Sequence, residues 1–304
     1  MAALKIKQPE QRGRNMIKTN YHTHTTYCDG VNTAEEMIQS AIEKRFSILG
    51  FSSHSIYPFA SDWHIAPRET EAYTEEIRSL AEKYRSKITV LCGFEADYIP
   101  GLSVPSKKQY EKFRPDYLIG SVHYLVTEKG NFTIDESAEG VKNGVDVFFK
   151  GNARKAVCEY FYAQREMLLH GDFEIWGHPD LFRKRNGILK LFNESESWYR
   201  SELKATARAA KKAGVIAEIN TGAISRGAMD DVYPSQEFLR LLAEQNVPVT
   251  VSSDAHNAES LDCAFERAYS SAKKAGYTET AYLDEACTIR FQKLSFSLKY
   301  NFLN

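Results

Sequence analysis

The stretch MIKTNYHTH, residues 16–24, decides how this chain folds. It begins as a short run of strand-forming residues and ends in two histidines that are separated by one residue. Side chains two positions apart on a strand lie on the same face, so His22 and His24 can bind one cation together. The stretch therefore predicts a β-strand whose C-terminal end carries metal-binding side chains.

Six more strand-like runs follow this first one, at residues 47–52, 88–95, 117–123, 173–178, 215–220 and 247–254. Helical patterns separate them: one begins at Thr33, where Glu36 completes a capping box, and others cover residues 68–84, 152–169, 195–213, 236–245 and 259–275. Strands that alternate with helices are typical of parallel βα units. We therefore predict an α/β barrel of seven strands rather than eight.

The composition is that of a globular protein, with 43% hydrophobic and 26% charged residues among 304. It excludes disordered, collagen-like and coiled-coil proteins. Since no repeat or Pro/Ser-rich linker divides the chain, we predict a single domain over residues 16–304. Residues 1–15 are expected to form a flexible extension, and the polar segment near 126–151 an insertion over one end of the barrel.

Charge and cysteine content narrow the choice of partners and compartment. The 39 basic and 40 acidic residues give a net charge of −1, so no overall field favours nucleic acid or an anionic membrane. The five cysteines form no CxxC pair, which argues against a disulfide framework. Neither a signal peptide nor a run of roughly 20 apolar residues is visible. We expect a cytoplasmic protein with a small-molecule partner, and neither nucleic-acid nor membrane binding.

Metal-compatible side chains mark the ends of the predicted strands. Five of the seven strands end at or just before a histidine, and Glu95 and Asp254 end two of them. In parallel barrels the C-terminal ends of the strands meet at one mouth and build the active site. Any one of these histidines alone is explained by ordinary hydrogen bonding, but their joint placement predicts a metal cluster. The role of Glu218 stays open between orienting a ligand histidine and a buried structural pair.

Six motifs carry a resemblance to a known family: YHTHTTYCDG, GFSSHS, GFEADY, SVHYL, GHPDL and SSDAHN, in this order and at these strand ends. Together they resemble the polymerase-and-histidinol-phosphatase (PHP) superfamily over residues 16–275. The resemblance implies a distorted, TIM-like (β/α)7 barrel with its metal site at the C-terminal strand ends. The stretches FEIWGHPDLFRK and EINTGAISR are similar to the branch that hydrolyses L-histidinol phosphate in histidine biosynthesis.

This resemblance implies three divalent metal ions. The first would be held by His22, His24, Glu95 and Asp254, the second by Glu95, His123 and His178, and the third by Asp29, His54 and His256. Mixed imidazole and carboxylate ligands suit zinc, iron or manganese, and the sequence does not choose among them.

Such a cluster suits hydrolysis of a phosphomonoester by a metal-bridging hydroxide, without a covalent intermediate. Phosphate oxygens are matched by the planar donors of arginine. As residues that bind the substrate we predict Arg183, Lys184, Ser225, Arg226 and, beside an imidazole-bearing substrate, His64. The residues predicted to take part in catalysis are Asp254, His256, Arg226 and Arg183.

Three alternatives stay open. Within the superfamily, the chain could be a nucleotide phosphatase, an exonuclease or a phosphotyrosine phosphatase, although long nucleic acids usually call for a basic stripe. An amidohydrolase also carries a His-x-His pair, but often has a lysine where this chain has His123. A non-catalytic metal-binding barrel is disfavoured, because structural zinc sites are usually rich in cysteine.

Overall fold

A parallel sheet of seven strands forms the centre of the computed structural model, which describes residues 16–55, 57, 59 and 61–294. The predicted extension 1–15 lies outside the described residues. Along the sheet the strands follow in the order β1 (Thr19–Asn20), β2 (Ile48–Phe51), β3 (Thr89–Asp97), β4 (Tyr117–Ser121), β7 (Ile175–Trp176), β8 (Ile216–Asn220) and β9 (Val249–Ser252). This order confirms the prediction of a distorted TIM-like barrel with seven strands.

The two ends of the sheet meet just past β1 and β9. Thr23 and Ala255 form a parallel bridge, in which the His24 amide donates to the Ala255 carbonyl at 2.9 Å and the Ala255 amide to the His22 carbonyl at 3.1 Å. The first strand, predicted over residues 16–22, is only two residues long, and so is β7, predicted over 173–178. Both strands are therefore shorter than predicted, and the histidines predicted at their ends, His22 and His178, lie just beyond them.

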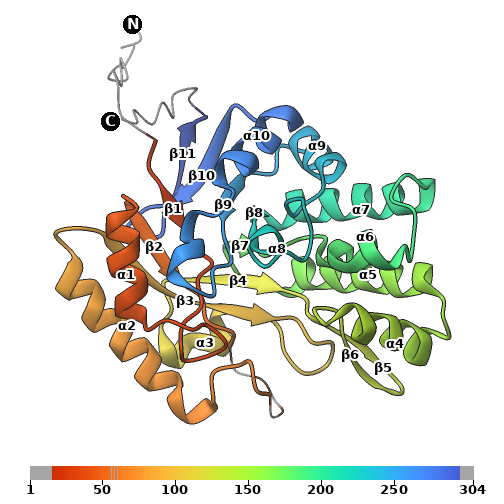
Figure 1. Cartoon of the computed structure of the whole chain (residues 1–304), viewed down its shortest axis with the longest axis horizontal. Coiled ribbons are helices and arrows are strands. Elements are labelled where there is room, and N and C mark those ends of the chain that lie inside the picture. Colours follow the sequence, from red (N-terminus) through yellow and green to blue (C-terminus); the bar gives the residue numbers. More distant parts are fainter. Residues whose placement is uncertain (1–15, 56, 58, 60, 295–304) are drawn as a thin grey trace, which may run out of the picture.

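Helices cover the outside of the sheet (Figure 1). They are α1 (Ala34–Glu43), α2 (Thr70–Tyr84), α3 (Lys107–Tyr110), α4 (Ala138–Phe149), α5 (Ala153–His170), α6 (Asn186–Leu189), α7 (Ser197–Ala213), α8 (Gly222–Ser225), α9 (Gln236–Glu244) and α10 (Phe265–Ala275). The capping box predicted for α1 is present, with Thr33 accepting from the Glu36 amide. The prediction of a helix over 259–275 is wrong at its start, because a 3₁₀ turn at Ala258–Asp262 comes first and α10 begins only at Phe265. No helix in the described ranges combines the length and apolar character needed to cross a bilayer.

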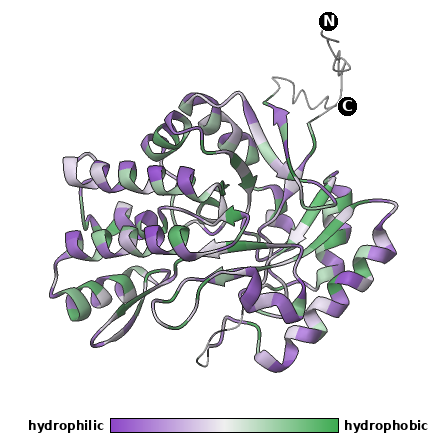
Figure 2. Cartoon of the chain, turned by 180° about the vertical axis from the view of Figure 1, so that it is seen from behind, coloured by the Kyte–Doolittle hydropathy of each residue, from purple (hydrophilic) through white to green (hydrophobic). Residues whose placement is uncertain are grey.

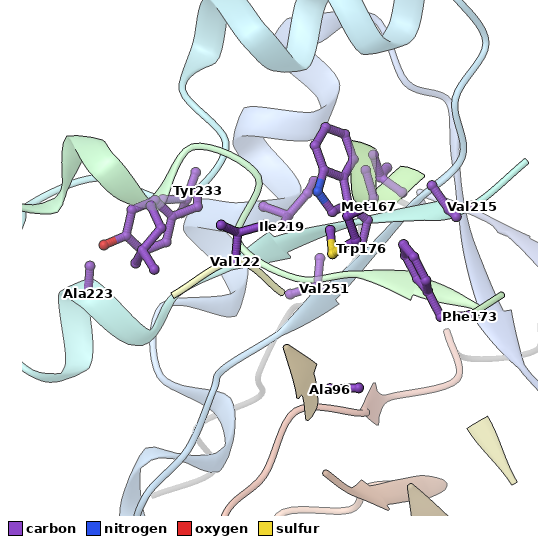
Figure 3. Packing of buried hydrophobic residues seen from close by; sticks show 14 of the residues in the cluster. Ala96, Val122, Met167, Phe173, Trp176, Val215, Ile219, Ala223, Tyr233 and Val251 are labelled. Atoms are coloured by element: carbon purple, nitrogen blue, oxygen red, sulfur yellow. The ribbon is translucent and has the colours of Figure 1, made fainter. Parts of the chain in front are cut away.

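Apolar side chains fill the space between the sheet and its helices. The strands at the centre are hydrophobic, whereas the helices carry polar residues on their outer sides (Figure 2). Trp176 of β7 and Met167 of α5 are fully buried together in this layer (Figure 3), and the Trp176 indole donates to Gln164 at 2.7 Å. Burial on this scale is the main force that holds the helices against the barrel.

The interior of the barrel is apolar at the N-terminal end of the strands. Tyr21, Leu91, Tyr117 and Ile216 belong to one buried cluster there. A hairpin formed by β10 (Glu279–Leu283) and β11 (Ile289–Lys293) contributes Leu283, whose amide donates to the Tyr21 hydroxyl at 2.9 Å while that hydroxyl donates to the Leu283 carbonyl at 2.8 Å. This end of the barrel is therefore packed shut, and polar side chains collect at the opposite end.

Residues 126–151, predicted as an insertion, contain regular structure. The strands β5 (Tyr124–Thr127) and β6 (Gly130–Thr133) pair as an antiparallel hairpin, and α4 follows it. Phe132 and Val145 are buried and anchor the segment in the main hydrophobic cluster. The segment thus has a fixed position, and residues that follow β6 reach the candidate site described next.

Candidate metal centre

Nine side chains gather at the C-terminal ends of the central strands. His22 and His24 follow β1, His54 follows β2, Glu95 lies in β3, His123 follows β4, His178 follows β7, Asp254 and His256 follow β9, and Asp29 lies in the loop before α1. Their nitrogen and oxygen atoms form overlapping groups in which all ligand atoms lie within 4.8 Å of one another. The structure therefore brings together every residue that the sequence predicted as a metal ligand.

The innermost group contains His22, His24, Glu95 and Asp254. The Nε2 atom of His22 lies 3.0 Å from Glu95 Oε2, and Nε2 of His24 lies 3.2 Å from Asp254 Oδ1. The crossed distances, His22 to Asp254 and His24 to Glu95, are 3.6 and 3.7 Å. Each of the two imidazoles thus lies within 3.7 Å of both carboxylates.

A second group shares Glu95. Its Oε1 atom lies 2.9 Å from His178 Nε2 and 3.5 Å from His123 Nε2, and the two Nε2 atoms are 3.2 Å apart. The hydroxyl of Ser121 donates to the same Oε1 atom at 2.7 Å. Since Glu95 uses one oxygen in each group, it bridges them.

The third group lies at the outer edge of the mouth. His256 Nε2 is 3.0 Å from Asp29 Oδ2, and His54 Nε2 is 3.8 Å from Asp29 Oδ1. Asp29 sits in a tight loop in which the Gly30 amide donates to the Thr25 carbonyl at 3.1 Å. This group is the most accessible of the three, with 31% of the Asp29 side chain and 21% of the His256 side chain exposed.

Several of these atoms fit a metal ion because they are buried and make no hydrogen bond within the described residues. His22 Nε2, His24 Nε2, His54 Nδ1 and Glu95 Oε2 are buried, and none makes a hydrogen bond within the described residues. A buried polar atom left without a hydrogen bond costs roughly 1–3 kcal/mol. Divalent cations bound among these residues would satisfy such atoms, and imidazole together with carboxylate is a donor set for zinc, iron or manganese. These buried clusters therefore fit divalent metal ions.

The electrostatics of the cluster, with no ion present, put its histidines in different charge states. Burial, together with the neighbouring His256 and His54, lowers the pKa of His24 to about 3, so its imidazole is neutral at pH 7. Burial alone would raise the pKa of Glu95, but the imidazoles of His22, His54 and His123 hold it well below its usual range. Burial opposes protonation of His22, but Glu218 and Glu95 raise its pKa well above the usual range. Burial likewise opposes protonation of His123, but Asp97 and Glu95 raise its pKa to about 9. Metal binding requires neutral imidazoles and ionised carboxylates, so it would displace protons from these two rings.

Two further carboxylates touch the ligand histidines from behind. Glu218 Oε1 lies 2.8 Å from His22 Nδ1, and Asp97 Oδ1 lies 2.9 Å from His123 Nδ1. Glu218 was considered from the sequence, but Asp97 was missed. The signal was present, because Asp97 follows Glu95 by two positions in a strand and so lies on the same face.

Comparison with known proteins places this architecture in a family. The PHP domain family matches residues 20–222. This chain belongs to the PHP domain family. The PHP chain is 28% identical to the probable histidinol-phosphatase of Schizosaccharomyces pombe over 284 residues, which cover 88% of this chain and 90% of the relative.

Two solved structures share the fold of this PHP chain. The putative histidinol phosphatase of Listeria monocytogenes aligns with a TM-score of 0.72 and 22% identity, covering 82% of this chain and 99% of that chain. The histidinol phosphate phosphatase of Lactococcus lactis, in complex with zinc, L-histidinol and phosphate, aligns with a TM-score of 0.66 and 20% identity, covering 90% of this chain and 99% of that chain. At these identities the comparison shows the fold.

Residues of the three metal groups form the base of a pocket of about 260 Å³. Besides the ligands, its wall is formed by Trp63, Thr133, Asp135, Glu136, Lys184 and Arg226. Three of these, Thr133, Asp135 and Glu136, come from the end of β6 and the residues after it. This volume is slightly below the roughly 300–1,000 Å³ of typical ligand pockets, so the pocket suits a small molecule rather than a large one.

Two of the predicted phosphate-binding residues lie in this pocket. Arg226 donates from Nη2 to Asp254 Oδ2 and from Nη1 to the Asp254 carbonyl, both at 2.9 Å. The ammonium group of Lys184 pairs with Asp135. Burial opposes ionisation of Asp135, but Lys184 and Arg226 lower its pKa to about 2. The structure therefore places two positively charged side chains, Lys184 and Arg226, beside the metal groups.

Arg183 lies outside the pocket, contrary to the prediction that it holds phosphate. It is buried, and its guanidinium donates to Glu194 Oε2 at 2.8 Å, to Asp231 Oδ2 at 2.9 Å and to the Val232 carbonyl at 3.3 Å. Arg183 and Lys184 are neighbours in a 3₁₀ turn, Leu181–Arg185, where successive side chains point about 120° apart. Lys184 lines the pocket, whereas the Arg183 guanidinium is held by carboxylates elsewhere.

Ser225 and His64 also differ from the prediction. The hydroxyl of Ser225 donates to the Gly222 carbonyl at 2.9 Å, and Ser225 does not line the pocket. His64 lines a separate, smaller cavity together with Tyr57 and Phe59. From this loop it is Trp63 that reaches the metal groups, with its ring centroid 4.7 Å from that of His54.

Gly222 allows Arg226 and Asp254 to pair, because a Cβ atom there would lie 2.7 Å from Arg226 Nη2 and 2.8 Å from Asp254 Oδ2. We expect Gly222→Ala to displace this pair and to lower kcat/KM for a phosphomonoester by about 10- to 100-fold, the cost of misplacing a catalytic group by about 1 Å. Steady-state kinetics check this. Gly187→Ala is the control, because nothing lies within 4 Å of its added Cβ; equal activity of both variants would contradict the expectation.

Proposed function

We propose that this chain is a metal-dependent phosphomonoester hydrolase whose substrate is L-histidinol phosphate. The observation that carries the proposal is the cluster of unpartnered imidazole and carboxylate atoms at the base of a pocket that also holds Arg226 and Lys184. The relatives support it: the S. pombe protein is named a probable histidinol-phosphatase, and the L. lactis structure contains zinc, L-histidinol and phosphate.

The proposal includes three divalent metal ions, of zinc, iron or manganese. His22, His24, Glu95 and Asp254 would hold the first, Glu95, His123 and His178 the second, and Asp29, His54 and His256 the third, as the distances within each group support. When bound, such ions lower the pKa of a water molecule and neutralise charge on the phosphoryl oxygens.

The side chains of the pocket wall bind and orient the phosphoryl group in this proposal. Arg226 offers a planar set of donors that matches phosphate oxygens, and Lys184 adds a positive charge. Asp254 has two tasks, because it is a metal ligand and also holds the Arg226 guanidinium through its carboxylate and its carbonyl. His256 Nδ1 lies 3.0 Å from Arg226 Nη1. Asp254 and His256, the two residues after β9 that were predicted to take part in catalysis, therefore both help to fix the position of this arginine.

The rest of the wall suits the leaving alcohol. L-Histidinol carries an ammonium group and an imidazole ring. Asp135 and Glu136 provide carboxylates for the ammonium group, and Trp63 provides an aromatic surface for the ring. A nucleoside monophosphate would bring a neutral nucleoside in place of this ammonium group and so lose its attraction to Asp135 and Glu136, which disfavours the alternative of a nucleotide phosphatase.

The test is phosphate release from L-histidinol phosphate, a nucleoside monophosphate and phosphotyrosine at equal concentrations. We expect kcat/KM for L-histidinol phosphate to exceed the others by at least about 100-fold, or about 2.7 kcal/mol of transition-state discrimination. Removal of metal by a chelator should abolish the activity, and zinc or manganese should restore it. The control is a sample treated with the same chelator after that chelator has been saturated with metal, so that it can remove none from the protein. Equal rates on all three substrates would reject the substrate, and activity in the chelated protein would reject metal dependence.

We further propose that the described part of the predicted domain 16–304 forms one domain and that the protein acts in the cytoplasm on a free small molecule. The bonds between Tyr21 and Leu283 support the first point, since they join the two ends of the described chain. The five cysteines are free, which agrees with a reducing compartment.

A further inference from the structure

Glu218 on β8 contacts residues of two different metal groups, although it belongs to neither. It is fully buried. Its Oε1 atom accepts from His22 Nδ1 at 2.8 Å, and its Oε2 atom accepts from the backbone amide of His178 at 2.9 Å and from Asn220 Nδ2 at 2.9 Å. Three donors therefore converge on one carboxylate.

The contact with His22 sets which nitrogen of that ring is free. A carboxylate accepts hydrogen bonds and cannot donate them when ionised, so Nδ1 must carry the proton. The lone pair is then on Nε2, the atom that faces Glu95 at 3.0 Å and Asp254 at 3.6 Å. Glu218 thus presents His22 to the first metal group in the form that can bind.

The contact with His178 holds a turn in the backbone. His178 has a φ of +22°, an unusual value for a residue other than glycine, and it follows the short strand β7. Its amide is fixed by Glu218, while its ring Nε2 lies 2.9 Å from Glu95 Oε1. The turn directs this imidazole into the second metal group.

Asn220 completes the arrangement. Its Nδ2 atom donates to Glu218 Oε2 at 2.9 Å and lies 3.4 Å from Asp254 Oδ2, and its Oδ1 atom accepts from the Gly222 amide at 2.8 Å. A glutamine at position 218 would place its NH₂ group against a group that donates to Glu218: His22 Nδ1, or the His178 amide and Asn220 Nδ2. The site therefore requires a carboxylate at position 218 and not only a polar side chain.

We propose that Glu218 is a positioning residue shared by two metal positions, so that its loss weakens the binding of two ions together. The inference rests on the metal sites of the proposed function. Asp97 provides the contrast, because its contacts with the ligand histidines are confined to His123, through the backbone amide and Nδ1, both at 2.9 Å. Loss of Asp97 should weaken one ion.

The experiment counts zinc ions and measures their dissociation constants, by titration against a competing chelator and by mass spectrometry of the metal content. Loss of a carboxylate behind a ligand histidine typically costs about 10- to 100-fold in metal affinity. We expect Glu218→Gln to weaken two ions by this factor and Asp97→Ala to weaken one. Thr250→Val is the control: Thr250 pairs with Glu218 in the sheet, is buried, and its hydroxyl makes no hydrogen bond within the described residues.

A second measurement does not depend on the folding of a variant. Long-range ¹H–¹⁵N correlation spectra of the zinc-loaded wild-type protein report which nitrogen of His22 carries a proton. We expect Nδ1 to be protonated and Nε2 to be free of a proton. A proton on Nε2 would overturn the inference.

Each outcome of the zinc titration has a clear meaning. Unchanged dissociation constants in Glu218→Gln would overturn the role of Glu218, and weakening of a single ion would overturn the shared role. Neither result depends on which phosphoester the protein hydrolyses. A wild-type protein that binds zinc as expected but does not hydrolyse L-histidinol phosphate would instead reject the proposed substrate.

Discussion

Replacement of Glu95 by glutamine is expected to lower kcat/KM for phosphomonoester hydrolysis by at least about 10³-fold. Its Oε2 atom lies 3.0 Å from both His22 Nε2 and His54 Nδ1, and its Oε1 atom lies 2.9 Å from His178 Nε2. Glutamine has no negative charge and only one accepting oxygen, so it cannot bridge two metal groups. Metal ions contribute several kcal/mol to catalysis of this kind, and each 1.36 kcal/mol is a factor of ten in rate.

Kinetics and metal content should change together in this variant. We expect Glu95→Gln to retain fewer zinc ions than the wild type after dialysis, with a similar far-UV circular dichroism spectrum. Ser252→Ala serves as the control, because it removes a buried hydroxyl that makes no hydrogen bond within the described residues. Full activity of Glu95→Gln would show that the cluster is not the catalytic centre.

Replacement of Arg226 by alanine is expected to lower kcat/KM by about 10²- to 10³-fold, the typical cost of removing a charge-stabilising donor from an active site. The guanidinium lies in the pocket and is held by Asp254 Oδ2 and the Asp254 carbonyl, both at 2.9 Å. Its loss removes the planar donors for phosphate. Arg226→Lys keeps the charge but not this geometry, so an intermediate activity is expected.

Inhibition by inorganic phosphate separates a binding role from a structural one. We expect the inhibition constant for phosphate to rise in Arg226→Ala, less in Arg226→Lys, and not at all in Arg200→Ala. Arg200 lies on α7, is half exposed and pairs with Glu237, so it controls for loss of an arginine elsewhere. An unchanged inhibition constant in Arg226→Ala would show that this arginine does not contact phosphate.

The fold and the gathering of histidines and carboxylates at one mouth were predictable from periodic patterns, whereas the division of the nine candidate ligands among three ions came from the resemblance to the PHP superfamily. Six of the seven strand-like runs have a metal-compatible side chain at or just past the C-terminal end, and parallel strands in a barrel bring these ends together. His22, Glu95 and Asp254 are far apart in the sequence, yet the first lies 3.0 Å from the second and 3.6 Å from the third. The order of the strands in the sheet is their order in the chain, apart from the inserted hairpin.

The pocket wall was predicted less well, because loops and short turns carry no periodic signal. Arg183 and Lys184 are adjacent, and only the direction of each side chain in a 3₁₀ turn decides which one faces the pocket. Asp135 lies in a segment expected to be a polar insertion, and its contribution depends on the pairing of β5 with β6. These positions are fixed by contacts between distant parts of the chain rather than by local sequence.

The segment that carries Thr133, Asp135 and Glu136 makes substrate choice a separable property of this protein. The hairpin of β5 and β6 leads directly into α4, so one continuous stretch supplies much of the wall, while the metal ligands come from the strand ends. Sequence change within this stretch can accumulate without altering a single ligand. A library randomised at these three positions would therefore sample new leaving groups on a constant reaction, which makes the segment a natural starting point for directed evolution and a place where related enzymes can diverge.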